Sequence, residues 1–270
     1  MPEIKTAVVT GASAGIGREI VRQLVLDRGL TVLATARRLD RLRELAAELP
    51  AGSVHVLEGD LADAGFRARL WEHAEAVLPG GVDLLVNNAG LGHYAEFTEE
   101  DPDVWRRIVE VNVVALMDLT QRAARHMKAR KSGQIVEISS ILGFVGIPYS
   151  AAYVATKHAV NGLVKCLRYE LRGTGVRVWA ACPGRTESEF TSVALGRPGG
   201  KGRAKAGAST ALVVRNILRG RDRDRQFLIP TWSAWALVTL AHWLPGPFEW
   251  FMQRWSPAYF QREIAEARSS

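Results

Sequence analysis

Residues 4–26 read IKTAVVTGASAGIGREIVRQLVL: a β-branched run, a glycine-rich turn and a stretch with helical spacing. The pattern predicts a strand over Ile4–Val9 and a helix over Ile16–Leu26. The turn between them, Thr10–Gly17, places glycines at a strand-to-helix junction, where the backbone turns sharply and lets an anion approach the free N–H groups of the helix. Because the spacing Gly-x3-Gly-x-Gly is not the commoner Gly-x-Gly-x-x-Gly, a purely structural tight turn is the alternative for this motif alone.

The same rhythm of strand, turn and helix continues along the chain. Further strands are predicted over Leu30–Thr35, Val54–Leu57, Val82–Val86, Gln134–Ser139, Val176–Ala181 and Gln226–Ile229. Further helices are predicted over Asp40–Leu49, Ala64–Val77, Pro102–Arg130 and Ala152–Arg172. Short apolar strands that alternate with amphipathic helices indicate a parallel sheet covered on both faces. We therefore expect a doubly wound, Rossmann-type α/β sheet of about seven strands, in a single domain over residues 1–230.

Composition and charge exclude several classes of protein. The 270 residues are 47% hydrophobic and carry a formal net charge of +7, which fits a globular α/β chain and excludes a fibrous or disulfide-rich one. The basic clusters lack interleaved aromatic residues, so we expect no nucleic-acid partner. The two cysteines, Cys166 and Cys182, lie in apolar stretches and are interpreted as reduced core residues. Since the sequence has neither a signal-peptide pattern nor an apolar run long enough to span a membrane, we expect a cytoplasmic protein.

A second constellation follows the predicted strand at Gln134–Ser139. Ser140 is followed thirteen residues later by Tyr153, and Lys157 stands four residues beyond it. This spacing puts Tyr153 and Lys157 on one face of a helix. A lysine ammonium lowers the pKa of a tyrosine, which suits acid–base chemistry, and the Ser140 hydroxyl can hydrogen-bond a carbonyl oxygen. A Tyr-x-x-x-Lys pair alone is commonly a surface contact, but its combination with Ser140 and the glycine-rich turn favours a catalytic site.

These motifs occur in a recognisable order. Over residues 4–230 the chain carries Thr10-Gly11-x3-Gly15-x-Gly17, Asn87-Asn88-Ala89-Gly90, Ser140-x12-Tyr153-x3-Lys157 and Pro183-Gly184. Together they resemble the short-chain dehydrogenase/reductase family, in its compact single-domain branch. The resemblance implies a Rossmann fold and nicotinamide-dependent interconversion of a carbonyl and an alcohol. It implies that Tyr153 is the general acid/base, that Lys157 tunes it and holds the nicotinamide ribose, and that Ser140 orients the substrate oxygen. It also implies that Asn112 holds a water for proton relay; a locally satisfied polar residue inside a helix is the alternative.

The glycine-rich turn and the resemblance together give a candidate dinucleotide site. Its residues are Thr10, Gly11, Ser13, Ala14, Gly15, Ile16, Gly17, Arg37, Arg38, Asp60, Leu61, Asn88, Ala89, Gly90, Tyr153, Lys157, Pro183, Gly184, Thr186 and Ser188. The end of the second strand has no acidic residue until Asp40, and Arg37 offers a fork of donors suited to a 2′-phosphate, which Arg38 assists. We therefore predict NADP(H) in preference to NAD(H), with two ordinary surface arginines as the alternative.

The predicted function is that of an NADP(H)-dependent oxidoreductase. The predicted pocket walls are apolar and comprise Leu91, Leu142, Phe144, Val145, Ile147, Tyr149 and Phe190. Such walls favour a lipophilic carbonyl or alcohol substrate over a sugar, although the same residues can pack the surrounding loops instead. The alternative function is a catalytically silent NADP-binding regulatory protein or a membrane-surface scaffold, for which a broken catalytic set is expected. His93 is interpreted as an exposed loop histidine, with substrate contact as the alternative, and the histidine spacing predicts no metal site.

The end of the chain differs in composition from the rest. Five of the eight tryptophans lie in the last 40 residues, so we interpret residues 231–270 as a helical extension packed on the same domain or at an interface. The apolar segment Ala234–Leu244 is too short to span a bilayer. We expect the extension to shield the lipophilic pocket, with peripheral membrane contact as the alternative. The resemblance, with apolar residues on the helix of Tyr153, predicts a homodimer or homotetramer.

Overall fold

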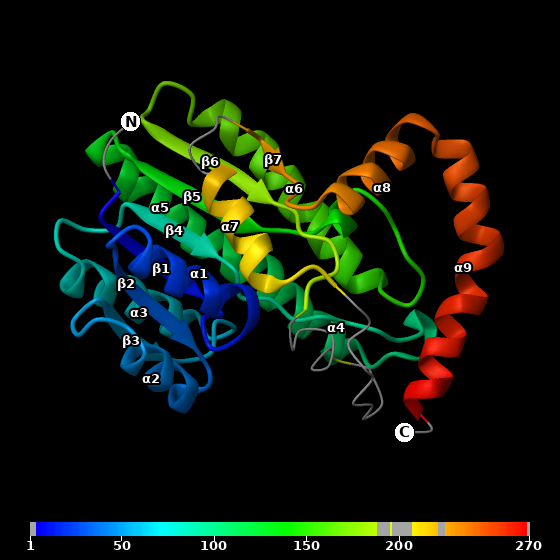
Figure 1. Ribbon diagram of the computed structural model, residues 1–270, viewed down its shortest axis with the longest axis horizontal. Helices are drawn as coiled ribbons and strands as arrows, with labels where there is room; N and C mark the ends of the chain where they lie inside the picture. The colour runs from blue at the N-terminus through cyan, green and yellow to red at the C-terminus, as the bar shows by residue number, and fades with distance from the viewer. Residues whose placement is uncertain (1–3, 188–194, 196–206, 221–224, 269–270) are drawn as a thin grey trace.

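The computed structural model describes residues 4–187, 195, 207–220 and 225–268, and its centre is a parallel sheet. The strands lie in the order β3-β2-β1-β4-β5-β6-β7 (Figure 1). Their bounds are β1 (Thr6–Thr10), β2 (Thr31–Ala36), β3 (Val54–Glu58), β4 (Leu84–Asn87), β5 (Gly133–Ile138), β6 (Val176–Ala181) and β7 (Phe227–Leu228). The strand order reverses between β1 and β4, which makes the carboxyl edge of these strands the place where open α/β sheets bind ligands. The predicted doubly wound Rossmann-type fold is confirmed.

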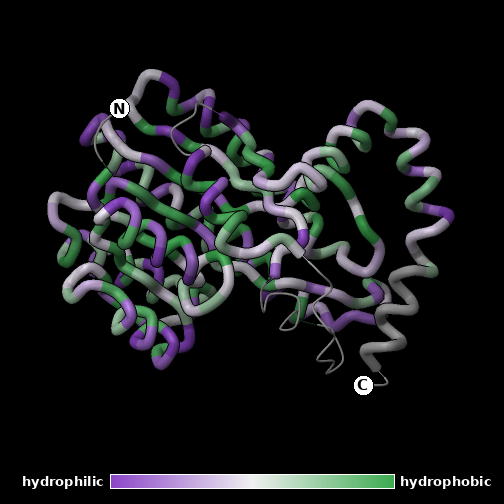
Figure 2. Tube along the Cα trace, viewed as in Figure 1, coloured by the Kyte–Doolittle hydropathy of each residue, from purple (hydrophilic) through white to green (hydrophobic). Residues whose placement is uncertain are grey.

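Helices cover both faces of the sheet. One face is covered by α1 (Gly15–Leu26), α2 (Leu39–Ala47) and α7 (Thr210–Gly220), and the other by α3 (Ala64–Val77), α5 (Ala115–Arg130) and α6 (Ala151–Glu170). Strand residues alternate between the two core layers, so that Val9 and Ala34 face the first layer while Val8 and Leu33 face the second. Figure 2 shows hydrophobic residues concentrated along the central strands. Burial on both faces explains why these strands read as continuous apolar runs.

The predicted helix over Pro102–Arg130 is interrupted. Helix α4 (Pro102–Val109) is separated from α5 by a π-helical turn over Glu110–Val114. Asn112 lies in this turn, and its side-chain amide bonds to the backbone of Leu91. Helical periodicity could not reveal the turn, because one extra residue leaves the apolar pattern on either side of it intact.

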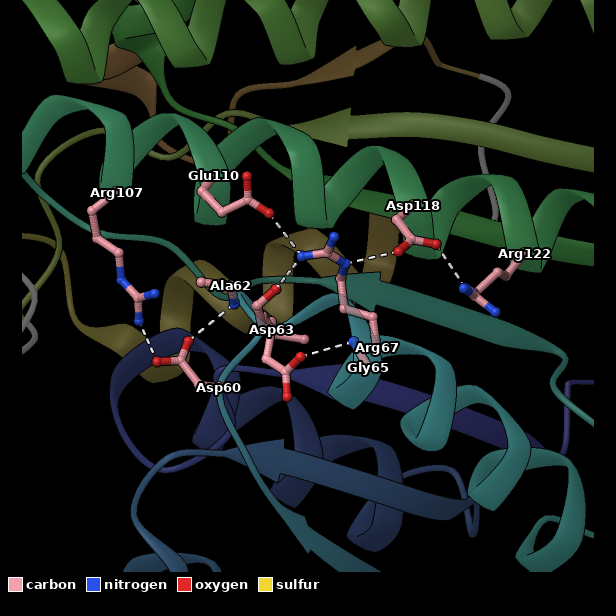
Figure 3. Close-up of polar contacts among 10 residues, drawn as sticks. Asp60, Ala62, Asp63, Gly65, Arg67, Arg107, Glu110, Asp118 and Arg122 are labelled. Carbon is pink, nitrogen blue, oxygen red and sulfur yellow. Dashed lines mark hydrogen bonds and ion pairs between the residues drawn. The ribbon is translucent and has the colours of Figure 1, made fainter. Parts of the chain in front are cut away.

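A buried arginine ties these helices to the loop after β3. Arg67 on α3 donates hydrogen bonds to Asp118 at 2.7 Å and to Glu110 at 2.9 Å (Figure 3). It also donates to the carbonyl oxygen of Leu61 at 2.7 Å, and Asp118 is shared with Arg122. Burial lowers the pKa of Arg67, but the two carboxylates outweigh it and raise the pKa overall. The network therefore fixes the backbone of Leu61 against α5.

The chain ends in two helices, α8 (Trp232–Trp243) and α9 (Pro245–Arg268), which extend away from the sheet (Figure 1). Ala234 is buried, and a Cβ at Gly184 would lie 2.9 Å from its Cβ, so the start of α8 packs beside the loop after β6. Nine large apolar side chains described for α8, α9 and the residue between them are exposed: Trp232, Trp235, Leu237, Leu240, Trp243, Leu244, Trp250, Phe251 and Trp255. Among the residues described, no helix combines the length and the apolar character needed to cross a membrane.

The two cysteines lie in different environments. Both are free thiols; Cys182 is buried after β6, whereas Cys166 is exposed on α6. The interpretation of Cys166 as a core residue was therefore wrong, because its position falls on the outward face of the helix.

Candidate active site

Three predicted catalytic side chains meet at the carboxyl edge of the sheet. Ser140 lies just beyond β5, after Ser139, and Tyr153 and Lys157 lie one turn apart on α6. Tyr153 is hydrogen-bonded to Ser140, and the Nζ of Lys157 lies 5.5 Å from the centre of the tyrosine ring. All three side chains are buried. The structure thus brings together the residues that the spacing selected.

The enclosure of the site determines how these groups ionise. Burial raises the pKa of Tyr153, and the hydrogen bond with Ser140 lowers it only in part. Burial lowers the pKa of Lys157 to about 8. The pKa of Tyr153 is therefore shifted in the opposite direction to the one expected from a neighbouring ammonium, because the loss of water around the phenolate dominates. The Lys157 Nζ donates its hydrogen bond to the Ile138 carbonyl instead, at 2.8 Å.

Asn112 joins the loop after β4 to the catalytic helix. Its Oδ1 accepts from the Leu91 N–H at 2.7 Å, while its Nδ2 donates to the Leu91 carbonyl at 3.0 Å and to Thr156 Oγ1 at 3.2 Å. Thr156 donates in turn to the Tyr153 carbonyl at 2.7 Å. A Cβ at Gly90 would lie 3.4 Å from the Asn112 Oδ1. Asn112 therefore positions both the loop and the helix, and its relay role stays a prediction.

The glycine-rich turn packs directly against the loop after β4. Thr10 Oγ1 accepts from the N–H groups of Asn88 and Ala89, each at 3.0 Å. The Asn88 Nδ2 donates to the Thr10 carbonyl at 2.9 Å. Gly11 has a φ of +66°, and a Cβ there would lie 2.8 Å from the Ala89 Cα. A Cβ at Gly17 would lie 2.4 Å from the Gly11 carbonyl oxygen, so both positions require glycine.

The first turn of α1 is open to an anion. The helix begins at Gly15, and its N-cap residue Ala14 supplies no side-chain hydrogen bond to the first N–H groups. Ile16 packs beneath this turn against the core. A hollow of about 830 Å³ adjoins the turn and is lined by Ser13, Ala14, Gly15, Arg18, Glu19, Arg22, Asp40, Arg41, Glu44, Glu48, Glu187 and Thr210. Tyr153 does not line it, so the hollow lies apart from the catalytic side chains, and its lining holds more carboxylates than arginines.

The two arginines after β2 take different positions. The guanidinium of Arg38 donates to Ser13 Oγ at 3.3 and 3.1 Å, which places it on the glycine-rich turn. Arg37 is exposed, and its charge helps to lower the pKa of Asp60. Both cations therefore lie near the end of β2, where the sequence predicted a phosphate contact.

Asp60 and Leu61 form a fixed loop after β3. The Asp60 carboxylate accepts from the Ala62 N–H at 3.0 Å and is ion-paired with Arg107 from α4 (Figure 3). Burial raises the pKa of Asp60, but these two partners outweigh it and the pKa is lowered overall. The carboxylate is thus engaged with the protein, and Leu61 is held through its carbonyl by Arg67.

The segment after β6 borders the site beside Ser140. The Pro183 carbonyl accepts from the Ile141 N–H at 3.1 Å, and Thr186 Oγ1 donates to the Gly184 carbonyl at 3.2 Å. These contacts place the segment beside Ser140. Two predicted residues of this region, Ser188 and Phe190, lie outside the described residues.

Sequence reasoning missed two acidic side chains that the structure buries, Glu137 and Glu100. Glu137 on β5 accepts hydrogen bonds from Thr120 at 2.7 Å and from Asn87 at 3.3 Å in the interior. His93 is buried with its Nε2 against a carboxylate oxygen of Glu100, so its interpretation as an exposed loop histidine was wrong. A charged residue within an apolar strand was the signal for Glu137, whereas no local pattern linked His93 to Glu100. In the part of the chain that the structure describes, no group of histidines, cysteines and carboxylates could hold a metal ion.

Comparison with known proteins assigns this architecture to a family. Residues 5–195 match the family model of short chain dehydrogenases. The human protein called dehydrogenase/reductase SDR family member 7 is 33% identical over 258 residues, which span 87% of this chain and 75% of that protein.

Solved structures of short-chain dehydrogenases have a similar fold. A short-chain dehydrogenase from Sphingobium yanoikuyae in complex with NADPH is 28% identical, with a TM-score of 0.78 over 93% of this chain and 96% of the other. A short chain dehydrogenase/reductase from Burkholderia phymatum in complex with NAD is 23% identical, with a TM-score of 0.82 over 90% of this chain and 95% of the other, and supports the fold alone. The family predicted from the motifs is confirmed, and the chain belongs to the short-chain dehydrogenase/reductase family.

Proposed function

We propose that this member of an oxidoreductase family uses NADP(H) to interconvert a carbonyl group and a secondary alcohol, with Tyr153 as the general acid/base. The observation that carries the proposal is the enclosed arrangement of Ser140, Tyr153 and Lys157 at the carboxyl edge of the sheet. Gly90 borders the same place, because a Cβ on it would lie 3.9 Å from the Lys157 Nζ. The catalytic groups and the loop of the dinucleotide site are therefore neighbours.

The residues of the glycine-rich turn fit a dinucleotide. Side chains at Gly11 and Gly17 would collide with backbone atoms, so the turn stays narrow and its N–H groups stay accessible to a pyrophosphate. The N-terminus of α1 has no side-chain cap that would compete for those groups. When bound, the nicotinamide supplies or accepts the hydride, while this chain supplies the proton and orients the reacting oxygen.

The ionisation of the site suits proton donation to a carbonyl oxygen. Because burial raises the pKa of Tyr153, its phenol holds a proton at neutral pH and can donate it as negative charge develops on the substrate oxygen. Ser140 lies within hydrogen-bonding reach of the phenol and can donate to the same substrate oxygen. The ammonium of Lys157 then stabilises the phenolate that remains.

A single substitution tests this function. We expect Tyr153→Phe to remove nearly all carbonyl reduction while NADPH binding survives, because the hydroxyl is needed for the proton and not for the dinucleotide. The matched control is Tyr169→Phe, which removes an exposed hydroxyl from the same helix. Turnover of Tyr153→Phe at the wild-type rate would refute the mechanism, and an inactive wild-type protein with tight NADPH binding would favour the silent regulatory alternative.

The preference for NADP(H) rests on the residues after β2. Arg37 and Arg38 supply two cations there, and Ala36 stands at the end of the strand where an acidic residue would repel a 2′-phosphate. The Sphingobium structure contains NADPH and the Burkholderia structure contains NAD, so similarity alone does not decide between them. We expect kcat/KM to be higher with NADPH than with NADH, and Arg37→Ala to reduce the difference. Equal efficiencies would contradict the proposal.

The substrate is proposed to be a lipophilic carbonyl or alcohol. Five of the predicted wall residues are partly exposed, namely Leu91, Leu142, Phe144, Ile147 and Tyr149, whereas Val145 is buried. Four of these five remain candidates for the pocket wall. Phe144 instead packs edge-on against Phe227, with ring centroids 5.1 Å apart, so it supports the core. A panel of aryl ketones, long-chain aldehydes and sugar aldehydes assayed with NADPH tests the proposal, which fails if the sugars are the better substrates.

We also propose a homodimer or homotetramer in which the extension of α8 and α9 is covered. Within α8, Ala234 is the buried residue, so most of the helix does not pack on its own subunit. Light scattering at micromolar concentration should show the oligomer, and a monomer would contradict it. Sedimentation with anionic liposomes that is lost after truncation at Ile229 would favour peripheral membrane contact instead. The cytoplasmic location stays a prediction.

A further inference from the structure

A carboxylate lies in the protein interior beneath the catalytic lysine. Glu137 on β5 has no exposed surface and shares a sheet face with Ile135, the face that α5 and α6 cover. It directly precedes Ile138, whose carbonyl oxygen accepts a hydrogen bond from the Lys157 Nζ at 2.8 Å. Its partner across the sheet is Asn87 at the end of β4. Glu137 therefore lies under the carboxyl edge, between the dinucleotide loop and the catalytic helix.

The hydrogen bonds of Glu137 satisfy one of its two oxygens. Its Oε1 accepts from Thr120 Oγ1 at 2.7 Å and from Asn87 Nδ2 at 3.3 Å, while its Oε2 has no hydrogen-bond partner among the described residues. A buried carboxylate is stable only where another charge or further hydrogen bonds compensate it. The cation that acts on Glu137 electrostatically is Lys157, and the attraction is mutual. Both side chains are buried, and their opposite charges attract each other.

We propose that Glu137 is a positioning residue for the catalytic lysine, whose carboxylate keeps Lys157 in its ammonium form beside Tyr153. The inference rests on the proposed function, because it assigns a purpose to a charge on Lys157. Glu137 itself touches neither the phenol nor the reacting oxygen. It acts through the lysine alone.

The groups that act on Lys157 come from three elements. Tyr153 lies on α6 with it, Glu137 lies on β5, and Cys182 follows β6. Burial raises the pKa of the Cys182 thiol to about 12, so this group stays neutral under assay conditions and supplies no charge. Burial likewise raises the pKa of Glu137 to about 7 and lowers the pKa of Lys157 to about 8. Above pH 7 Glu137 is therefore the acidic group that holds the proton on Lys157.

The charge on Glu137 can be removed with little change in shape. Glu137→Gln keeps an oxygen that accepts from Thr120 and Asn87, and it deletes the negative charge. Without that charge the Lys157 ammonium is less stable, so its pKa falls by about one unit. We expect the pKa, measured by NMR titration of 13C-labelled lysine side chains in the protein without substrate, to fall accordingly, with the Lys157 signal assigned by its loss in Lys157→Met.

Activity provides an independent second measurement. In Glu137→Gln the alkaline limb of the kcat/KM profile, with NADPH and an aryl ketone, should move to lower pH by the same amount as the lysine pKa. Glu137→Asp retains the charge and should restore the limb. The matched control is Glu170→Gln, which neutralises an exposed carboxylate on the helix of Lys157 and should change neither measurement.

A second variant covers the case in which Glu137→Gln does not fold. Thr120→Val is isosteric and removes one hydrogen bond to the carboxylate, so the pKa of Glu137 rises and that of Lys157 falls by a smaller amount. A Lys157 pKa that is the same in wild type, Glu137→Gln and Thr120→Val would overturn the inference. Because the titration needs no turnover, this failure is distinct from active Tyr153→Phe, which would refute the proposed function instead.

Discussion

Arg67→Met should destabilise the protein more than any other removal of a charged side chain on this face of α3. Arg67 is 5% exposed, and its guanidinium joins Asp118, Glu110 and the Leu61 carbonyl through hydrogen bonds of 2.7, 2.9 and 2.7 Å. Breaking a buried ion pair by removing one partner typically costs about 3–5 kcal/mol. Both carboxylates are partly exposed, and Asp118 keeps Arg122 at 2.6 Å. The lower end of that range, about 3 kcal/mol, is therefore expected.

The assay is urea denaturation followed by circular dichroism. Arg122→Met is the control. The Arg122 side chain is 33% exposed and contacts Asp118 but not Glu110. We therefore expect this variant to lower the free energy of unfolding by no more than about 1 kcal/mol. Burial raises the pKa of Asp118, but its two arginine partners lower it below the ordinary 3.8. This stabilisation is present above pH 3.8 and is lost as the pH falls through the lower native pKa, so the difference between wild type and Arg67→Met should narrow in acid. If Arg67→Met lowers the free energy of unfolding no more than Arg122→Met does, the reasoning is refuted.

Three further predictions concern the site and the extension. Lys157→Ala should reduce both turnover and NADPH affinity, whereas Tyr153→Phe should reduce turnover alone. Fluorescence titration measures the NADPH affinity, and equal affinities in the two variants would contradict this prediction. Gly17→Ala should lower NADPH affinity at least tenfold, because its Cβ would lie 2.4 Å from the Gly11 carbonyl oxygen. The control Gly162→Ala on α6, where a Cβ would meet no atom within 4 Å, should leave the affinity unchanged. Equal NADPH affinities in the two variants would argue against a turn that depends on glycine at this position. Truncation after Ile229 should cause aggregation on size-exclusion chromatography or loss of activity, and a fully active, monodisperse product would show that the extension is dispensable.

Parts of the site depend on local spacing and were therefore predictable. The four-residue interval between Tyr153 and Lys157 fixes both on one face of any helix that contains them. The glycines of the first turn mark a strand-to-helix junction, and the structure shows a physical need for them at Gly11 and Gly17. In each case the residues that matter are neighbours in sequence or within one helical turn. Topology rules for parallel strands then bring Ser140 to the same edge.

Other features depend on contacts between distant segments. Glu137 reads as an exception in an apolar strand, but its partner Thr120 comes from α5 and its charge partner Lys157 from α6. His93 is buried in contact with Glu100, and this pairing could not be read from either residue alone. The direction of the pKa shift at Tyr153 also differed from expectation, because spacing shows which groups are near but not how much water they lose.

The π-helical turn over Glu110–Val114 makes the length of this segment as important as its composition. In an uninterrupted α-helix, Glu110 and Asp118 would point about 80° apart around the axis, since each residue advances by about 100°. The wider turn absorbs one residue, so the two carboxylates come within about 20° of each other, as residues seven apart do. Both can then reach Arg67, as observed. Deleting one residue from the turn would leave a regular helix in which Glu110 and Asp118 stand seven residues apart, so both would still reach Arg67. The same residues wound as a regular α-helix at full length would instead rotate Asp118 away from Arg67.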